Sequence, residues 1–88
     1  MKKSTLVRNP LTSAQIRAGR ALIRWSAEDL AQACALAVTT IRRAELTEQQ
    51  TSLTAANDLA IRHALEAAGV DFIPENGGGV GVRLRKRV

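Results

Sequence analysis

The sequence predicts a mainly α-helical domain in which four short helices are followed by a C-terminal β-hairpin. The chain has 88 residues, enough for one small domain. Apolar residues make up 45% of it, but Trp25 and Phe72 are the only aromatic residues, which favours a bundle of small side chains over a β-sandwich. Helix-start signals recur along the first two thirds, and after Gly69 the apolar period changes from helical to alternating.

The first helix is predicted over about 13–23. Thr12 is a favourable N-cap, and Gln15 stands three residues later, as a capping box requires. Leu11 and Ile16 have the spacing of a hydrophobic staple, in which the residue before the cap packs on the first turn. We therefore expect a well-defined start to this helix.

Arg20 falls between Ile16 and Ile23 on the apolar face of the first helix. An unpaired charge on a buried face is costly, so Arg20 should have an acidic partner. Glu45, one turn beyond Ile41 in the third predicted helix, is the candidate.

The second helix is predicted over about 27–34. Ser26 is its expected N-cap, and Asp29 stands at the third helical position. Acidic residues in the first turn also suit the positive end of the helix dipole. We expect Leu30 and Ala33 to face the core.

The third helix is predicted over about 38–46, after a turn at 35–37. Ile41 and Ala44 should point inward. Ala37 is a poor cap, so a late start with Thr39 as the cap is an alternative. The side of this helix that is not expected to face the core carries Val38, Thr39, Arg42 and Arg43.

The fourth helix is predicted over about 54–68, with Gly69 as its stop. Residues 70–73 then read as a strand, and a glycine-rich turn follows at 74–79. A lone hairpin is marginal in water, so it should pack on the helices or pair with a second copy. The apolar stripe of the helix comprises Ala60, Ile61, Ala64, Leu65 and Ala68, and the second strand alternates Val80, Val82 and Leu84 with Gly81, Arg83 and Arg85.

Several segments of the span from about 12 to 68 resemble the XRE family, the Cro and phage-repressor class of helix-turn-helix transcriptional regulators. The segment at 64–79 is also similar to the ending of a subgroup of small bacterial regulators of this class. The segments that carry the resemblance are GRAL at 19–22, WSAEDLA at 25–31, TIRRAE at 40–45 and ALEAAGVDFIPENGGG at 64–79.

This resemblance implies a sequence-specific regulator that binds a two-fold operator in double-stranded DNA as a homodimer, with the third helix in the major groove. It also implies an Arg20–Glu45 pair, in agreement with the argument from the apolar face. Three positions depart from the family pattern: Ala35 replaces the usual turn Gly, Ala37 the usual cap, and Ala44 a bulky apolar residue. By resemblance, the residues facing bases are Val38, Thr39, Arg42 and Arg43. Ser26 and Arg17 are the candidates for contacts with backbone phosphates.

Charge placement is consistent with a polyanionic partner. The net charge is +5, and basic residues gather at the two ends of the chain. We expect a flexible basic arm at 1–10, the DNA-binding domain at 11–69, and a hairpin with a basic tail at 70–88 that is a candidate dimerisation element. Two solubilising tails are the alternative explanation of the charge. The main alternative function is a protein-interaction module, such as an antitoxin or antiactivator, with a partner encoded nearby.

The sequence offers little support for catalysis, a cofactor or a metal. Cys34 is the single cysteine and His63 the single histidine, and no paired carboxylates accompany them. The glycine run at 77–79 precedes a strand, whereas a phosphate-binding loop precedes a helix. No apolar run reaches the roughly 20 residues of a membrane span, and no signal peptide is evident. We therefore expect a non-enzymatic cytoplasmic protein with no membrane association.

Overall fold

The computed structural model describes residues 10–47, 51 and 53–85, and it confirms the mainly α fold with a C-terminal hairpin. The expected arm at 1–10 and the end of the basic tail lie almost wholly outside the described residues. The elements are α1 (Ser13–Leu22), α2 (Ala27–Cys34), α3 (Val38–Leu46), α4 (Ala55–Ala67), β1 (Val70–Ile73) and β2 (Gly81–Leu84).

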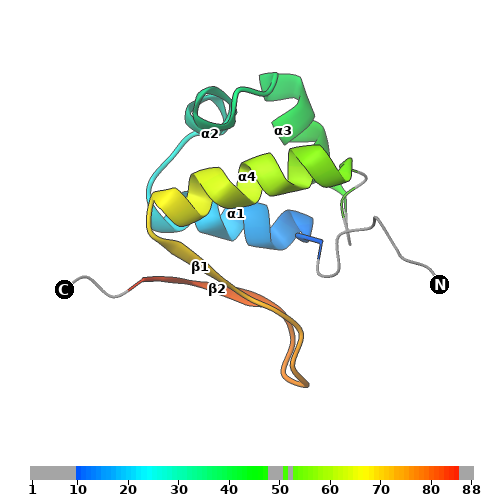
Figure 1. Ribbon diagram of the computed structural model, residues 1–88, viewed down its shortest axis with the longest axis vertical. Coiled ribbons are helices and arrows are strands. Elements are labelled where there is room, and N and C mark those ends of the chain that lie inside the picture. The colour runs from blue at the N-terminus through cyan, green and yellow to red at the C-terminus, as the bar shows by residue number, and fades with distance from the viewer. Residues whose placement is uncertain (1–9, 48–50, 52, 86–88) are drawn as a thin grey trace.

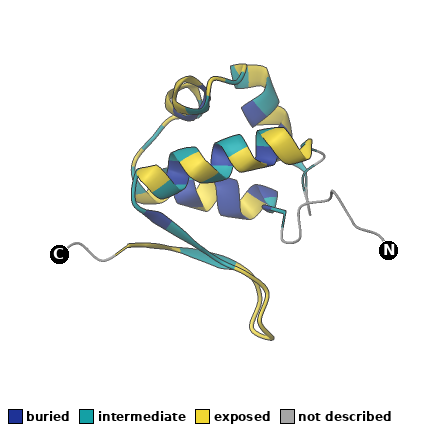
Figure 2. Cartoon of the chain, in the orientation of Figure 1, coloured by how far each residue is buried: buried dark blue, intermediate teal, exposed yellow. Residues whose placement is uncertain are grey.

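The elements form three levels along the longest axis of the molecule. Helices α1 and α4 lie in the middle, α2 and α3 lie at one end, and the hairpin lies at the other (Figure 1). The buried side of each helix faces the shared interior, and the outer surfaces are exposed (Figure 2). The buried apolar core consists of Leu11, Ile16, Leu30, Ala31, Ile41, Ala44, Ile61, Leu65 and Val70.

Both predicted capping boxes are present. The Thr12 side chain accepts a hydrogen bond from the Gln15 amide at 3.1 Å, and the Gln15 side chain accepts one from the Thr12 amide. Ser26 and Asp29 make the same reciprocal pair at the start of α2. Each box satisfies amide groups that a helix start otherwise leaves unpaired, which explains why the predicted starts of α1 and α2 are correct.

Two buried polar side chains connect elements in ways that local sequence patterns do not indicate. Asp58 of α4 is almost fully buried, and its Oδ2 accepts from the Leu11 amide at 2.9 Å. The Nε2 of Gln15 donates to the carbonyls of Ile73 and Gly81, one on each strand, at 3.3 and 3.0 Å. Gln15 therefore completes its own helix cap and also holds the hairpin against α1.

The two predicted segments form the hairpin, but burial does not alternate along β2: Gly81 and Val82 are half-buried, whereas Arg83 and Leu84 are exposed. Val80 precedes β2 and is also exposed. The two strands are antiparallel, with Val70 opposite Leu84 and Phe72 opposite Val82. Val70 is fully buried, and Phe72 and Val82 pack on the core. The hairpin therefore packs on the helices, which is one of the two arrangements expected from the sequence; the other, pairing with a second copy, stays a prediction.

One inward-facing residue was predicted wrongly. Ala33 is exposed, and Ala31 is the small residue of α2 that lies in the core beside Leu30. With α2 only eight residues long, its orientation follows from its contacts with both α3 and α4. The helix ends also differ slightly: α1 stops one residue earlier than predicted, and α4 is one residue shorter at each end.

The turn between α2 and α3 contains an alanine in the left-handed region. Ala35 has φ 59° and ψ 39°, and its amide donates to carbonyls of the last turn of α2. A side chain in this conformation costs about 1–2 kcal/mol. Ala35 thus adopts the conformation that favours glycine, the residue that the resembled family usually has in this turn.

We predict that Ala35→Gly raises the free energy of unfolding by about 0.5–1 kcal/mol, because relief of the strain exceeds the added entropy of the unfolded chain. Urea denaturation measures the change. The matched control is Ala33→Gly, at an exposed helical position, which should lower the free energy of unfolding by roughly 0.5–1 kcal/mol. If both variants are destabilised alike, the left-handed residue is not strained.

Candidate functional site

Helix α3 presents an exposed outer face. It begins at Val38, and Ala37 stands at the N-cap without a side-chain hydrogen bond. The amides of Thr40 and Ile41 both donate to the Ala37 carbonyl, so the helix does not start late, and the alternative with Thr39 as the cap is wrong. The short turn and the buried Ile41 and Ala44 orient the helix, because they place one side of α3 in the core.

Three of the four residues predicted to face bases lie on this outer face. Thr39, Arg42 and Arg43 are exposed. Val38 is half-buried and packs against the core. Arg43 also lines a shallow depression between α3 and the start of α4, whose other residues are Thr40, Ala44, Leu53, Thr54 and Asn57.

The predicted Arg20–Glu45 pair is present and bidentate. The Nε and Nη2 atoms of Arg20 each donate to a different carboxylate oxygen of Glu45, both at 2.7 Å. Glu45 is 9% exposed and Arg20 21% exposed. Because Glu45 accepts these bonds, the pKa of Arg20 is raised above its usual value despite partial burial. The pair joins α1 to the last turn of α3.

The Arg20 guanidinium reaches a third segment as well. Its Nη1 donates to the Trp25 carbonyl at 2.8 Å, in the connection that leads into α2. One side chain therefore fixes α1, the entry to α2 and the end of α3 relative to one another. The orientation of the outer face of α3 depends on this contact.

The two residues predicted to contact phosphates both have contacts within the protein. Arg17 Nη1 donates to the Glu45 carbonyl at 2.5 Å, near the C-terminal end of α3. A cation at this end complements the helix dipole. The Ser26 hydroxyl oxygen accepts from the Asp29 amide at 3.0 Å, which leaves the hydroxyl hydrogen available for another acceptor.

One contact on the outer face did not emerge from the sequence reasoning. Arg42 Nη2 donates to Glu28 Oε2, which links the middle of α3 to the first turn of α2. Glu28 is one of the acidic first-turn residues of α2, for which the sequence indicates only a favourable interaction with the helix dipole. The two residues are 14 positions apart, so no helical spacing indicates the pair.

Other reactive groups do not form a cluster in the described part of the chain. Burial raises the pKa of the half-buried Cys34 thiol, which disfavours the reactive thiolate at neutral pH. His63 is exposed. Among residues 10–47, 51 and 53–85, no group of three or more histidine, cysteine or acidic residues is placed to hold a metal. The same residues contain no helix that is long and apolar enough to cross a membrane.

Comparison of the chain with models of known protein families and with curated proteins gives no match.

We predict that Arg20→Ala lowers the free energy of unfolding by about 3 kcal/mol, because it leaves the nearly buried Glu45 carboxylate without its partner. Chemical denaturation measures the loss. Arg83→Ala is the control, since it removes an arginine from the exposed pair with Asp71 and should cost less than about 1 kcal/mol. Comparable losses in the two variants would show that the Arg20–Glu45 pair has no special structural role.

Proposed function

We propose that this protein is a sequence-specific DNA-binding regulator of the XRE type, with α3 as its recognition helix. The observation that carries the proposal is the outward presentation of Thr39, Arg42 and Arg43 on a helix whose other side is buried. Two neighbouring helices joined by a three-residue turn, with the second helix exposed, match the geometry with which helix-turn-helix proteins enter the major groove.

The exposed side chains have suitable chemistry. Arginine donates two hydrogen bonds to O6 and N7 of guanine, and threonine donates to bases or phosphates. Arg42 and Arg43 project about 100° apart around the helix axis. One is therefore suited to a base edge and the other to a phosphate. Because Val38 is half-buried, only its outer part is available to contact a thymine methyl group.

Arg17 and Ser26 are secondary contacts in this proposal. The hydroxyl of Ser26 stands at the start of α2, where the helix dipole and the first amides favour an anionic phosphate. Arg17 is exposed beside the end of α3. Its bond to the Glu45 carbonyl uses one donor and leaves others for a phosphate oxygen.

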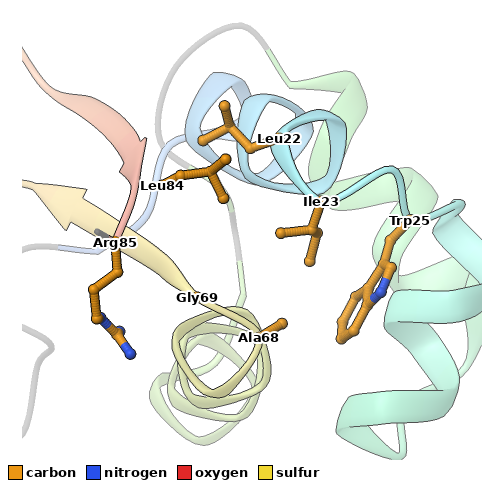
Figure 3. A pocket seen from close by; sticks show the side chains of 7 residues that line it. All are labelled: Leu22, Ile23, Trp25, Ala68, Gly69, Leu84 and Arg85. Carbon is orange, nitrogen blue, oxygen red and sulfur yellow. The ribbon is translucent and has the colours of Figure 1, made fainter. Parts of the chain in front are cut away.

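A single short recognition helix covers few base pairs, so we propose that the protein acts as a homodimer on a two-fold site. The hairpin, at the opposite end from α2 and α3 (Figure 1), is the proposed contact. Beside it lies an open groove where Leu84 of β2 and Leu22 of α1 lie next to each other (Figure 3). Exposed apolar side chains at this end are suited to burial against a protein surface.

The hydrogen-bond register of the hairpin supports a second copy as the occupant. The Arg85 amide donates to the Gly69 carbonyl one position beyond the last strand pair. Because bonded and non-bonded pairs alternate in an antiparallel ladder, the backbone groups of Val82 and Leu84 point away from β1. In the described part of the chain the sheet has only two strands, so this edge of β2 offers donors and acceptors that a two-fold copy matches.

The same groove suits a different protein partner, as the antitoxin or antiactivator alternative requires. Its apolar lining supports protein contact in general. The self-complementary edge of β2 favours the second copy.

We predict that the protein selects a two-fold sequence from a randomised duplex pool, and that affinity for this operator survives moderate salt better than affinity for random DNA. Arg42→Ala or Arg43→Ala should cost roughly 1–3 kcal/mol in operator binding if the side chain holds a base. Fluorescence anisotropy at fixed salt measures both. Arg83→Ala, which removes the same charge from the hairpin, is the control, and sedimentation velocity checks that it leaves the proposed dimer intact. Equal operator affinity of wild type and the Arg42/Arg43 double alanine variant would reject the assignment of α3.

We predict that Leu84→Glu shifts the protein from dimer to monomer, since it places a charge in the proposed apolar contact. Sedimentation velocity measures the shift. Leu59→Glu is the matched control, because Leu59 is a similarly exposed leucine on α4. A Leu84→Glu protein that remains fully dimeric would exclude this interface. Deleting residues 71–88 is a less informative test, since it also removes Phe72 and Val82 from the packing around the core.

A further inference from the structure

The exposed ion pair between Glu28 of α2 and Arg42 of α3 contributes little to the free energy of unfolding. The side chains of Arg42 and Glu28 are 54% and 62% exposed. Ion pairs this exposed contribute on the order of 0–1 kcal/mol. The core contacts of Leu30, Ile41 and Ala44 and the Arg20–Glu45 pair already hold the two helices. Glu28 also suits the positive end of the α2 dipole, but neither this position nor the exposed pair accounts for its placement against Arg42.

Glu28 is an unfavourable residue for simple attraction to DNA. Its carboxylate lies against an arginine of the face that we assign to the major groove. Non-specific binding depends on cations that neutralise phosphates. An anion beside Arg42 weakens that attraction on every sequence, because it offsets the arginine charge and repels phosphates.

The geometry of the guanidinium allows a specific contact to remain. Arginine carries five N–H donors, and the bond to Glu28 involves Nη2. The other hydrogen of Nη2 and those of Nη1 are free to meet O6 and N7 of a guanine. Holding the long side chain in advance reduces the rotamer entropy that binding would otherwise cost.

We propose that Glu28 is a positioning residue that determines specificity: it holds Arg42 for one base edge and disfavours DNA that lacks that base. The inference rests on the proposed DNA-binding function of α3. It assigns to α2 a part in reading sequence, in addition to the phosphate contact that we propose for Ser26. The carboxylate acts through Arg42 and does not itself touch DNA.

The test compares two duplexes, the operator selected from the randomised pool and a scrambled duplex of equal length. Dissociation constants are measured at one fixed salt concentration. The readout is the specificity ratio, the Kd for the scrambled duplex divided by the Kd for the operator. Glu28→Ala should lower this ratio about tenfold, through weaker operator binding and stronger binding to the scrambled duplex. Glu28→Gln removes the charge but keeps an acceptor for Arg42, so it should mainly strengthen binding to the scrambled duplex.

Two controls separate positioning from general electrostatics. Glu66→Gln removes one negative charge from α4 and should leave the ratio within about twofold of wild type. In an Arg42→Ala background, Glu28→Ala should also change the ratio less than about twofold, because the residue that it positions is gone. A role in folding or in overall charge would act equally in both backgrounds.

The possible outcomes are distinguishable. If the wild type prefers its operator and Glu28→Ala keeps that preference, the positioning role is overturned while the proposed function stands. If Glu28→Ala lowers the ratio equally with and without Arg42, the role is overturned as well. If the wild type fails to distinguish the operator from the scrambled duplex, the proposed function itself is rejected, and the inference with it.

Discussion

The bidentate ion pair between Arg20 and Glu45 is the contact on which the rest of the structure depends. The Arg20 guanidinium donates hydrogen bonds to both carboxylate oxygens of Glu45 in α3 and to the Trp25 carbonyl, which precedes α2. Three segments that are separate in sequence thereby acquire one relative orientation. A bidentate arginine pair is suited to this role, because its two parallel bonds restrict direction as well as distance. The partial burial of both groups makes the loss of either partner costly.

Around that contact, several polar side chains of this small domain form hydrogen bonds that connect one element to another. Among the described residues, few apolar side chains are fully buried, as expected for a chain of this size. Gln15 takes part in the capping box of α1 and also donates a hydrogen bond to the hairpin. Asp58 accepts a hydrogen bond from the Leu11 amide, just before α1. Arg17 donates one to the Glu45 carbonyl near the end of α3. These bonds connect elements that the thin core alone would hold weakly. They also keep the hairpin at the opposite end from α3, which separates the proposed dimer contact from the proposed DNA contact.

The outer face of α3 carries residues suited to binding DNA, and an acidic residue of α2 lies beside them. Thr39, Arg42 and Arg43 are exposed and chemically suited to base edges and phosphates, whereas Glu28 offsets part of that charge. Specificity is a difference between affinities, and a residue that lowers the affinity for every wrong sequence increases that difference. The same face therefore accounts for both parts of the proposal, recognition by α3 and its refinement from α2.

The sequence by itself determined the order of the elements and the starts of the first three helices, because capping and periodicity act over a few neighbouring residues. It also indicated the Arg20–Glu45 pair, since a charge on an apolar face requires a partner. Tertiary structure decided which small residue of α2 is buried, how deeply Val38 sits, and that Arg42 meets Glu28. It likewise decided the second role of Gln15 and the burial of Asp58. These features depend on where whole helices lie relative to one another, and local pattern carries no information on that packing.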